Sequence, residues 1–221
     1  MGRRAKAPAG CFPLSIAKVM TLFKYPDSFT HNKYKVDWNS LSSYNGYSTA
    51  EGRKSAAALL YSISLGCDSW YFYAGTFTFP GKATDFMEFC GFNNVGKESY
   101  KYKKVKEMID NTCPVIIYAM PGVNVFKSHC WNIDGYMEKE RTVTTTTKRG
   151  NTVINTNTST EKLKMVHCDF GWSGKNNGYY VDGIFKANGS LTEFDNYSGN
   201  DTSVKYNSYI HIITYDKPNG R

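Results

Sequence analysis

The order of two residue periodicities restricts the fold of this chain most strongly. Up to about residue 111, apolar side chains recur at helical spacing, which predicts helices over 11–25, 51–65, 83–89 and 98–111. From residue 114 onward, short apolar or alternating runs predict strands over 114–120, 129–137, 163–170, 178–185 and 208–215. Helices followed by an antiparallel sheet predict an α+β fold, with the N-terminal helical part packed on the sheet.

A threonine-rich segment separates the second and third of these strands. It reads RTVTTTTKRGNTVINTNTST, residues 141–160, with Arg-Gly-Asn at its middle. Alternating residues on both sides of a glycine turn predict a β-hairpin. We expect this hairpin to be an insertion over 138–162 that leaves the core. The 221 residues are enough for one well-buried domain, so we expect a single domain over 1–221.

The chain is basic, with a formal net charge of +8, and its densest basic segment is KESYKYKKVKEM, residues 97–108. Apolar residues recur through this segment at helical spacing: Tyr102, Val105, Met108 and Ile109. The lysines are therefore expected on the solvent face of a helix, and no nucleic-acid partner is predicted.

Neither a membrane span nor a secretory signal is expected. The longest nearly apolar run, residues 56–65, is about half of the ~20 residues that a spanning helix needs. The opening MGRRAKAPAG is basic but has no apolar segment behind it.

Cys11 is the candidate nucleophile. A thiol attacks a carbonyl as thiolate, so a nucleophilic cysteine needs a lowered pKa. The positive end of a helix and a neighbouring imidazolium both lower it. Of the six cysteines, only Cys11, which follows Gly10, lies at the expected start of a helix.

Four histidines are candidates for the base. His31 lies in a polar loop, His129 begins a strand directly after a loop, and His167 and His211 lie within strands among apolar neighbours. A histidine in a strand is more often a packed residue than a base, so position alone does not choose between them. Adjacent strand residues point to opposite faces, so a cleft-facing His129 would leave Cys130 pointing into the body.

Two His-Cys dipeptides, residues 129–130 and 167–168, raise the alternative of a zinc site. Each dipeptide can offer only one ligand to a shared site, because its two side chains point to opposite faces of a strand. We therefore expect no metal, and no cofactor is predicted.

Three motifs together resemble the C10 cysteine peptidases, the streptopain family. They are AGCFPLSIAKVM at 9–20, SHCWNIDGY at 128–136 and VHCDFGWSGKNNGYY at 166–180. The resemblance spans nearly the whole chain, and the third motif is the most specific. It implies a papain-like α+β fold and an endopeptidase that works through a Cys-His dyad and a thioester acyl-enzyme.

Carried over residue by residue, the resemblance makes Cys11 the nucleophile and His129 the base. Asp169 takes the position of the asparagine that holds the imidazole. Four further residues match the substrate and oxyanion environment: Gly10, Ser128, Gly171 and Trp172. The resemblance also implies protein or peptide substrates, a prodomain or proteinaceous inhibitor as partner, and a secreted or cell-surface location in a bacterium.

The sequence departs from the family pattern at the oxyanion hole. The family has a glutamine donor upstream of its cysteine, whereas this chain contains no glutamine and only ten residues precede Cys11. Phe170 also replaces the first tryptophan of the third motif. Two alternatives stay open: a catalytically impaired binding module with the peptidase fold, and a C39-like Cys-His peptidase.

Overall fold

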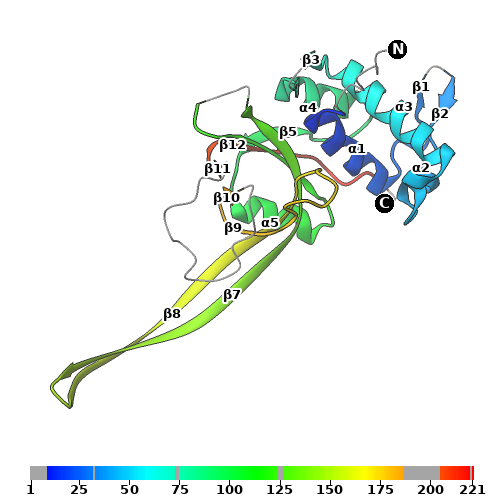
Figure 1. Ribbon diagram of the computed structural model, residues 1–221. Helices are drawn as coiled ribbons and strands as arrows, with labels where there is room; N and C mark the ends of the chain where they lie inside the picture. Colours follow the sequence, from blue (N-terminus) through cyan, green and yellow to red (C-terminus); the bar gives the residue numbers. More distant parts are fainter. Residues whose placement is uncertain (1–8, 32, 73–74, 124–126, 187–204, 220) are drawn as a thin grey trace, which may run out of the picture.

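Most of the helices gather on one side of an antiparallel sheet, one helix lies on its other side, and two strands of that sheet extend far beyond it (Figure 1). The computed structural model describes residues 9–31, 33–72, 75–123, 127–186, 205–219 and 221. The helices in these ranges are α1 (Cys11–Phe23), α2 (Trp38–Ser42), α3 (Ala50–Gly66), α4 (Pro80–Phe89) and α5 (Tyr102–Asp110), with a short 3₁₀ helix at Gly46–Ser48. The α+β architecture predicted from the sequence is confirmed.

The main sheet has six strands in the order β5-β12-β6-β7-β8-β9, and every neighbouring pair is antiparallel. Their bounds are β5 (Gly96–Ser99), β12 (Ser208–Thr214), β6 (Val115–Met120), β7 (His129–Arg149), β8 (Thr152–Asp169) and β9 (Gly178–Val181). Three short antiparallel pairs lie outside it: β1 (Thr30–His31) with β2 (Tyr34–Lys35), β3 (Trp70–Phe72) with β4 (Gly75–Phe77), and β10 (Phe185–Lys186) with β11 (Lys205–Tyr206).

Helix α1 connects the helical layer to the sheet. Ile16 and Met20 on its apolar face are fully buried, in a hydrophobic cluster that also contains residues of β6 and β7. The side-chain amide of Asn132, on β7, donates to the main-chain oxygen of Ser15 at 3.2 Å. The start of α1 is thereby fixed against the start of β7, which is where the candidate nucleophile and base lie.

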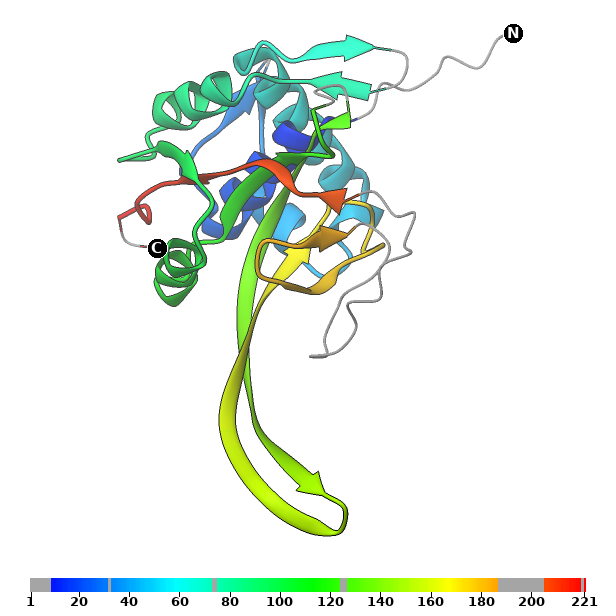
Figure 2. The same ribbon diagram turned by 90° about the vertical axis from the view of Figure 1, so that its left-hand side faces the viewer.

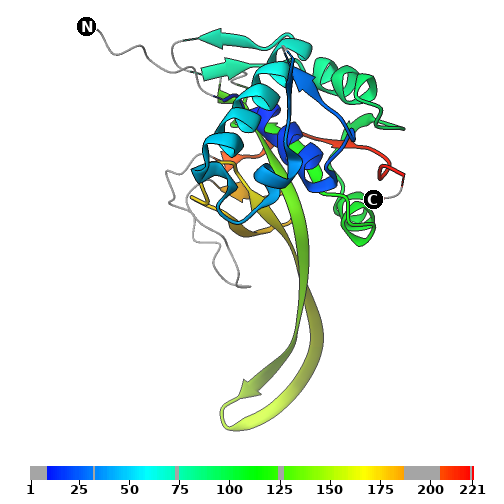
Figure 3. The same ribbon diagram turned by 90° about the vertical axis from the view of Figure 1, so that its right-hand side faces the viewer.

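Strands β7 and β8 continue beyond the body as a long two-stranded arm (Figures 1–3). The ladder runs from Asn132 paired with Asp169 to Arg149 paired with Thr152, and Gly150 closes the turn with φ of 60°. The predicted hairpin and its glycine turn are confirmed. Its strands continue the core strands, with register shifts at Ile133/Gly135 and Thr147/Lys148, so the insertion over 138–162 lengthens the sheet.

Most predicted elements are confirmed, and the largest difference is at the start of the fourth predicted helix. Residues 98–101 were expected in the fourth helix, but Gly96–Ser99 forms β5 and the helix begins at Tyr102. Pairing with β12 satisfies the main-chain groups of this segment, and this tertiary contact overrides the local pattern. Tyr102, Val105 and Met108 are buried, as expected for the apolar face of α5.

Two smaller differences follow from single residues. The expected strand over 178–185 divides into β9 and β10, because Gly183 turns the chain with φ of 74°. Helix α4, which was expected over 83–89, begins earlier, at Pro80. Proline fits the first turn of a helix because the N–H that it lacks would have no acceptor there. Among the helices of the described ranges, none combines the length and apolar character needed to cross a membrane.

Candidate active site

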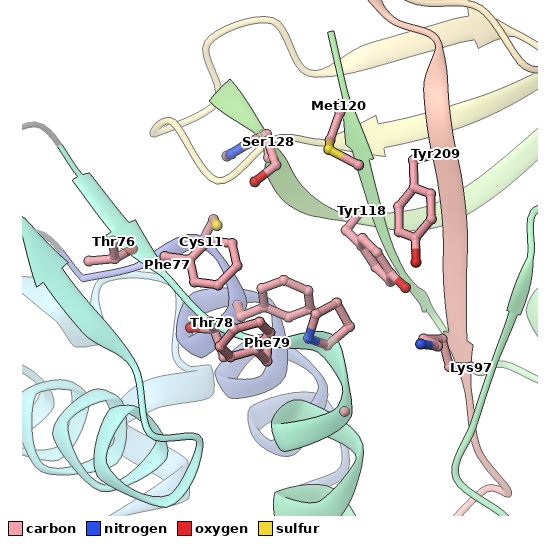
Figure 4. A pocket seen from close by; sticks show the side chains of 14 residues that line it. Cys11, Thr76, Phe77, Thr78, Phe79, Lys97, Tyr118, Met120, Ser128 and Tyr209 are labelled. Carbon is pink, nitrogen blue, oxygen red and sulfur yellow. The ribbon is translucent and has the colours of Figure 1, made fainter. Parts of the chain in front are cut away.

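Cys11 and His129 line the same two pockets at the junction of the helical layer and the sheet. Cys11 is the first residue of α1, and His129 is the first residue of β7. The larger pocket, hereafter the main pocket, has a volume of about 490 Å³ and is drawn in Figure 4. Ser128 also lines both pockets. The two residues that the sequence proposed as nucleophile and base are thus brought to one place.

Gly10 allows the chain to enter α1 at this point. Its φ of 83° lies in the left-handed region, which side chains other than glycine rarely adopt. A Cβ at Gly10 would also lie 3.1 Å from the ring of Pro13 and 3.2 Å from the hydroxyl of Thr76. Glycine therefore directly precedes Cys11 for a conformational and a steric reason.

Burial raises the pKa of the Cys11 thiol above its usual value of 9.0. The main-chain N–H groups of Cys130 and Phe12 favour the thiolate and oppose this shift, but they do not outweigh the burial. The sequence predicted a lowered pKa from the helix terminus and a neighbouring imidazolium. That expectation is wrong for the substrate-free protein, because burial also keeps the imidazole of His129 neutral.

The His129 ring is held by one hydrogen bond and a set of aromatic rings. Its Nε2 lies 2.9 Å from the main-chain oxygen of Phe170, which can only accept, so Nε2 carries the proton and Nδ1 is left to act as base. The Trp172 ring stacks on it at 4.6 Å, and Trp131 and Phe170 stack at 6.0 Å. Burial, aided by the charge of Lys18, lowers the pKa of His129 to about 4.

The Asp169 carboxylate binds α1 and its own turn. Oδ2 lies 2.6 Å from Lys18 Nζ, while Oδ1 accepts from the Gly171 N–H and the Asn177 amide, each at 3.0 Å. Burial opposes ionisation, but Lys18 and the two N–H donors together hold the pKa of Asp169 below 3.8. The imidazole hydrogen bond that was assigned to Asp169 from the sequence goes to the Phe170 carbonyl.

Lys18 was not among the residues predicted for the site. It lies on the same face of α1 as Cys11, seven residues or about two turns further along. This spacing could have predicted that Lys18 lies on the Cys11 face of the helix, but nothing in the sequence indicated an acidic partner for Lys18. The Phe170 carbonyl could not be predicted, because a main-chain acceptor leaves no trace in residue type.

Gly171 and Trp172 form the turn that covers the imidazole. Gly171 has φ of 77°, which other residues rarely adopt, and a Cβ there would also lie 2.8 Å from a methyl carbon of Leu14 on α1. Trp172 keeps 36% of its surface exposed while its ring stacks on His129. Both residues line the smaller pocket with Cys11, so the predicted environment of the site is brought together.

His167 and His211 line neither of the two pockets that Cys11 lines. His167 bonds through Nδ1 to Asp134 at 2.5 Å, and His211 stacks on Tyr118 at 5.6 Å. Cys130 and Cys168 are buried in the core cluster, whereas His129 lines the pockets and His167 is half-buried, as expected for adjacent strand residues on opposite faces. Within the described ranges, no cluster of three or more metal-ligating side chains occurs.

Two solved structures are similar to this chain in fold. The active wild-type interpain A cysteine protease of Prevotella intermedia has a TM-score of 0.66 and 14% identity, covering 96% of this chain and 85% of that one. A mutant prointerpain A fragment from the same organism has a TM-score of 0.62 and 16% identity, covering 98% of this chain and 66% of that one. These similarities show the papain-like fold.

A comparison with curated proteins finds no match. The family model described as the peptidase C10 family, in contrast, matches residues 1–180. That range holds Cys11, His129 and the turn that carries Trp172, and it covers most of the chain. This chain therefore belongs to the peptidase C10 family of cysteine peptidases.

Proposed function

We propose that this chain is an active cysteine endopeptidase that hydrolyses peptide bonds through Cys11 and His129. The observation that carries the proposal is their joint position on two pockets, with Nε2 of His129 bonded to a carbonyl and Nδ1 left as the base. We propose residues 1–221 as a single catalytic domain.

The reaction starts from a neutral pair. Because the pKa of Cys11 is raised and that of His129 is lowered, the substrate-free protein holds a thiol and a neutral imidazole at neutral pH. Cys11 Sγ then attacks the peptide carbonyl carbon while Nδ1 of His129 takes the thiol proton. The imidazolium donates that proton to the leaving nitrogen as the C–N bond breaks, which leaves a thioester on Cys11.

Water completes the cycle. His129 takes a proton from the water as it attacks the thioester, and this proton returns to Sγ when the C–S bond breaks. The main-chain N–H of Cys11 lies in the first turn of α1, where N–H groups have no acceptor within the helix. It is the proposed donor to the oxyanion that forms in both steps.

Asp169 acts in this proposal as a positioning residue. Its bonds to Lys18 and to the Gly171 N–H hold the turn in which the Phe170 carbonyl meets the imidazole. Asp169→Asn would keep an acceptor for Gly171 and lose the charge pair with Lys18. It should lower kcat by about tenfold or less, whereas loss of the base itself costs about 10²–10⁴.

Partners and location follow from the family. Substrates are proteins or peptides, and the similarity to a prointerpain fragment supports a prodomain as a regulatory partner, with a proteinaceous inhibitor as the other candidate. The peptidase C10 match supports a secreted or cell-surface location in a bacterium.

The decisive test is labelling by a thiol-directed peptidase inhibitor together with hydrolysis of fluorogenic peptides. We expect one label per chain and measurable hydrolysis, both abolished in Cys11→Ala. Cys113→Ala, which changes a buried cysteine outside the two pockets, is the matched control and should keep both. An unmutated, folded protein that neither labels nor hydrolyses would overturn the proposal.

The raised pKa of Cys11 favours one second candidate, a binding module with the peptidase fold. This alternative predicts peptide binding without labelling or turnover. A C39-like peptidase would share the labelling, but its specificity would be confined to leader peptides.

A further inference from the structure

The main pocket leads from the two reactive residues into an apolar space. Phe12 at the start of α1, together with Phe77, Phe79 and Pro80 between β4 and α4, forms the wall on the helical side. Met120 lies on the sheet side. With a volume of about 490 Å³ beside Cys11 and His129, this space can hold one large substrate side chain close to the scissile bond.

The sheet adds polar groups to this otherwise apolar pocket. Tyr118 comes from β6, Tyr209 from β12 and Lys97 from β5, and all three line the pocket. Tyr118 pairs with His211, while Lys97 pairs with Ile213 two residues further along β12. Lys97 and Tyr118 therefore point to the same face of the sheet. Figure 4 shows both tyrosine hydroxyls and the lysine ammonium on the side away from Cys11.

The Tyr118 hydroxyl is buried and has no hydrogen-bond partner within the described part of the chain. Tyr118 as a whole is 4% exposed. Burial raises the pKa of this phenol, so it is a neutral donor at physiological pH. Native proteins pair the large majority of buried polar groups, and an unpaired one needs an explanation. Tyr118 lines the pocket while its hydroxyl is covered by neighbouring side chains, so we infer that a ligand supplies the acceptor when these side chains shift as it binds.

Two neighbouring side chains, His211 and Lys97, also favour a ligand that supplies a hydrogen-bond acceptor. The His211 ring stacks on Tyr118 at 5.6 Å, and its Nδ1 is also buried without a partner among the described residues. Lys97 forms no ion pair with another described residue, and its exposed ammonium lies at the edge of the pocket. Tyr118 and Lys97 both offer protons, so the complementary group is an oxygen acceptor.

We propose that the main pocket selects a tyrosine side chain of the substrate next to the scissile bond. The inference rests on the proposed peptidase function and names the substrate class of that site. The three phenylalanine rings suit an aromatic ring, and the phenol oxygen accepts from Tyr118. A phenylalanine would leave the Tyr118 hydroxyl unpaired, and a glutamate would bring a charge into an apolar space where the exposed Lys97 neutralises it only weakly.

Matched peptides test the proposal directly. Four sets of peptides carry Tyr, Phe, Leu or Glu at one variable residue and are otherwise identical. Within each set, the variable residue is placed in turn at each position that flanks the cleaved bond. The sets are compared by kcat/KM. At one position we expect Tyr to exceed Phe by about 10- to 100-fold, because the site was built around a hydrogen bond to the substrate. Phe equal to or better than Tyr at every position would overturn the proposal, as would a preference for Glu.

Removal of one hydroxyl identifies the residue responsible. Tyr118→Phe keeps the ring and should bring the Tyr-to-Phe ratio to within about threefold. Tyr136→Phe also deletes one hydroxyl, but that hydroxyl bonds Asp110 away from the pocket, so the ratio should not change. An unchanged ratio in Tyr118→Phe would contradict the assignment.

Binding to the Cys11→Ala protein separates this proposal from the peptidase function. Calorimetry with uncleaved Tyr and Phe peptides should show tighter binding of the Tyr peptide. If the unmutated chain hydrolyses nothing while this difference is present, the peptidase function fails and the tyrosine pocket stands. Equal binding of the two peptides overturns the pocket whatever the activity.

Discussion

The two ends of one strand pair are stabilised in different ways. At the base, β7 and β8 lie between β6 and β9, and side chains on both of their faces are buried: Cys130, Trp131, Ile133, Met165, Val166 and Cys168. In the arm, side chains of β8 from Thr152 to Lys162 are all exposed, and within the described part of the chain no further strand of the main sheet flanks the pair. The same ladder of main-chain hydrogen bonds runs through both ends.

The difference separates packing from hydrogen bonding as sources of stability. A two-stranded hairpin without a packed face is marginal in water. The ion pairs near its root, Arg141 with Glu161 at 2.8 Å and Lys162 with Glu140 at 3.3 Å, are exposed and contribute little. We infer that the base holds the arm in place, and that the arm adds little to the stability of the base.

The largest effect is expected from a cavity at the base. Ile133 on β7 is fully buried, so Ile133→Ala should lower the free energy of unfolding by about 2–5 kcal/mol. Val143→Ala, ten residues further along the same strand, is the matched control in the arm and should change it by about 0.5 kcal/mol or less. Urea unfolding measures both. Equal losses would contradict the division between base and arm.

The second effect is the pH dependence of stability that comes from His129, the first residue of β7. Burial lowers the pKa of His129 from 6.5 to about 4. Between these values the unfolded chain binds a proton that the folded chain does not, so the free energy of unfolding falls as the pH is lowered from 6.5 towards 4. The contribution is at most about 3 kcal/mol.

His129→Gln isolates this contribution. The difference in unfolding free energy between the unmutated protein and this variant, measured by urea unfolding at several pH values, should be constant above pH 7 and change between 6.5 and 4. The pairing of Asp169 with Lys18 is present in both proteins and its effect cancels. A difference that stays flat over this window would show that the imidazole is accessible to protons in the folded state.

The smallest effect is expected when the arm is removed. Arg141 and Glu161 are register partners, so an Asn-Gly turn can replace residues 142–160 between them. We expect a change of about 1 kcal/mol or less in the free energy of unfolding. Inhibitor labelling of Cys11 should keep its rate. Failure to fold, or loss of labelling, would show that the arm supports the base after all.

Local sequence predicted the elements better than it predicted their contacts. Cys11 at a helix start and the Arg-Gly-Asn turn were readable because glycine and residue spacing mark them directly. Edge strand β5 was missed because pairing with β12, far along the sequence, decides its structure. The Phe170 carbonyl and the raised pKa of Cys11 depend on depth of burial, which a residue pattern does not report.

The register of the arm also bears on how this protein can change during evolution. At the base both faces of β7 are packed, and a slip of one residue would exchange the side chains of the two faces, so its length is fixed. In the arm most side chains are polar and those of β8 are exposed on both faces, so an added residue is tolerated if the opposite strand gains one as well. Relatives of this protein should therefore differ in length here, mainly by matched insertions on the two sides of Gly150.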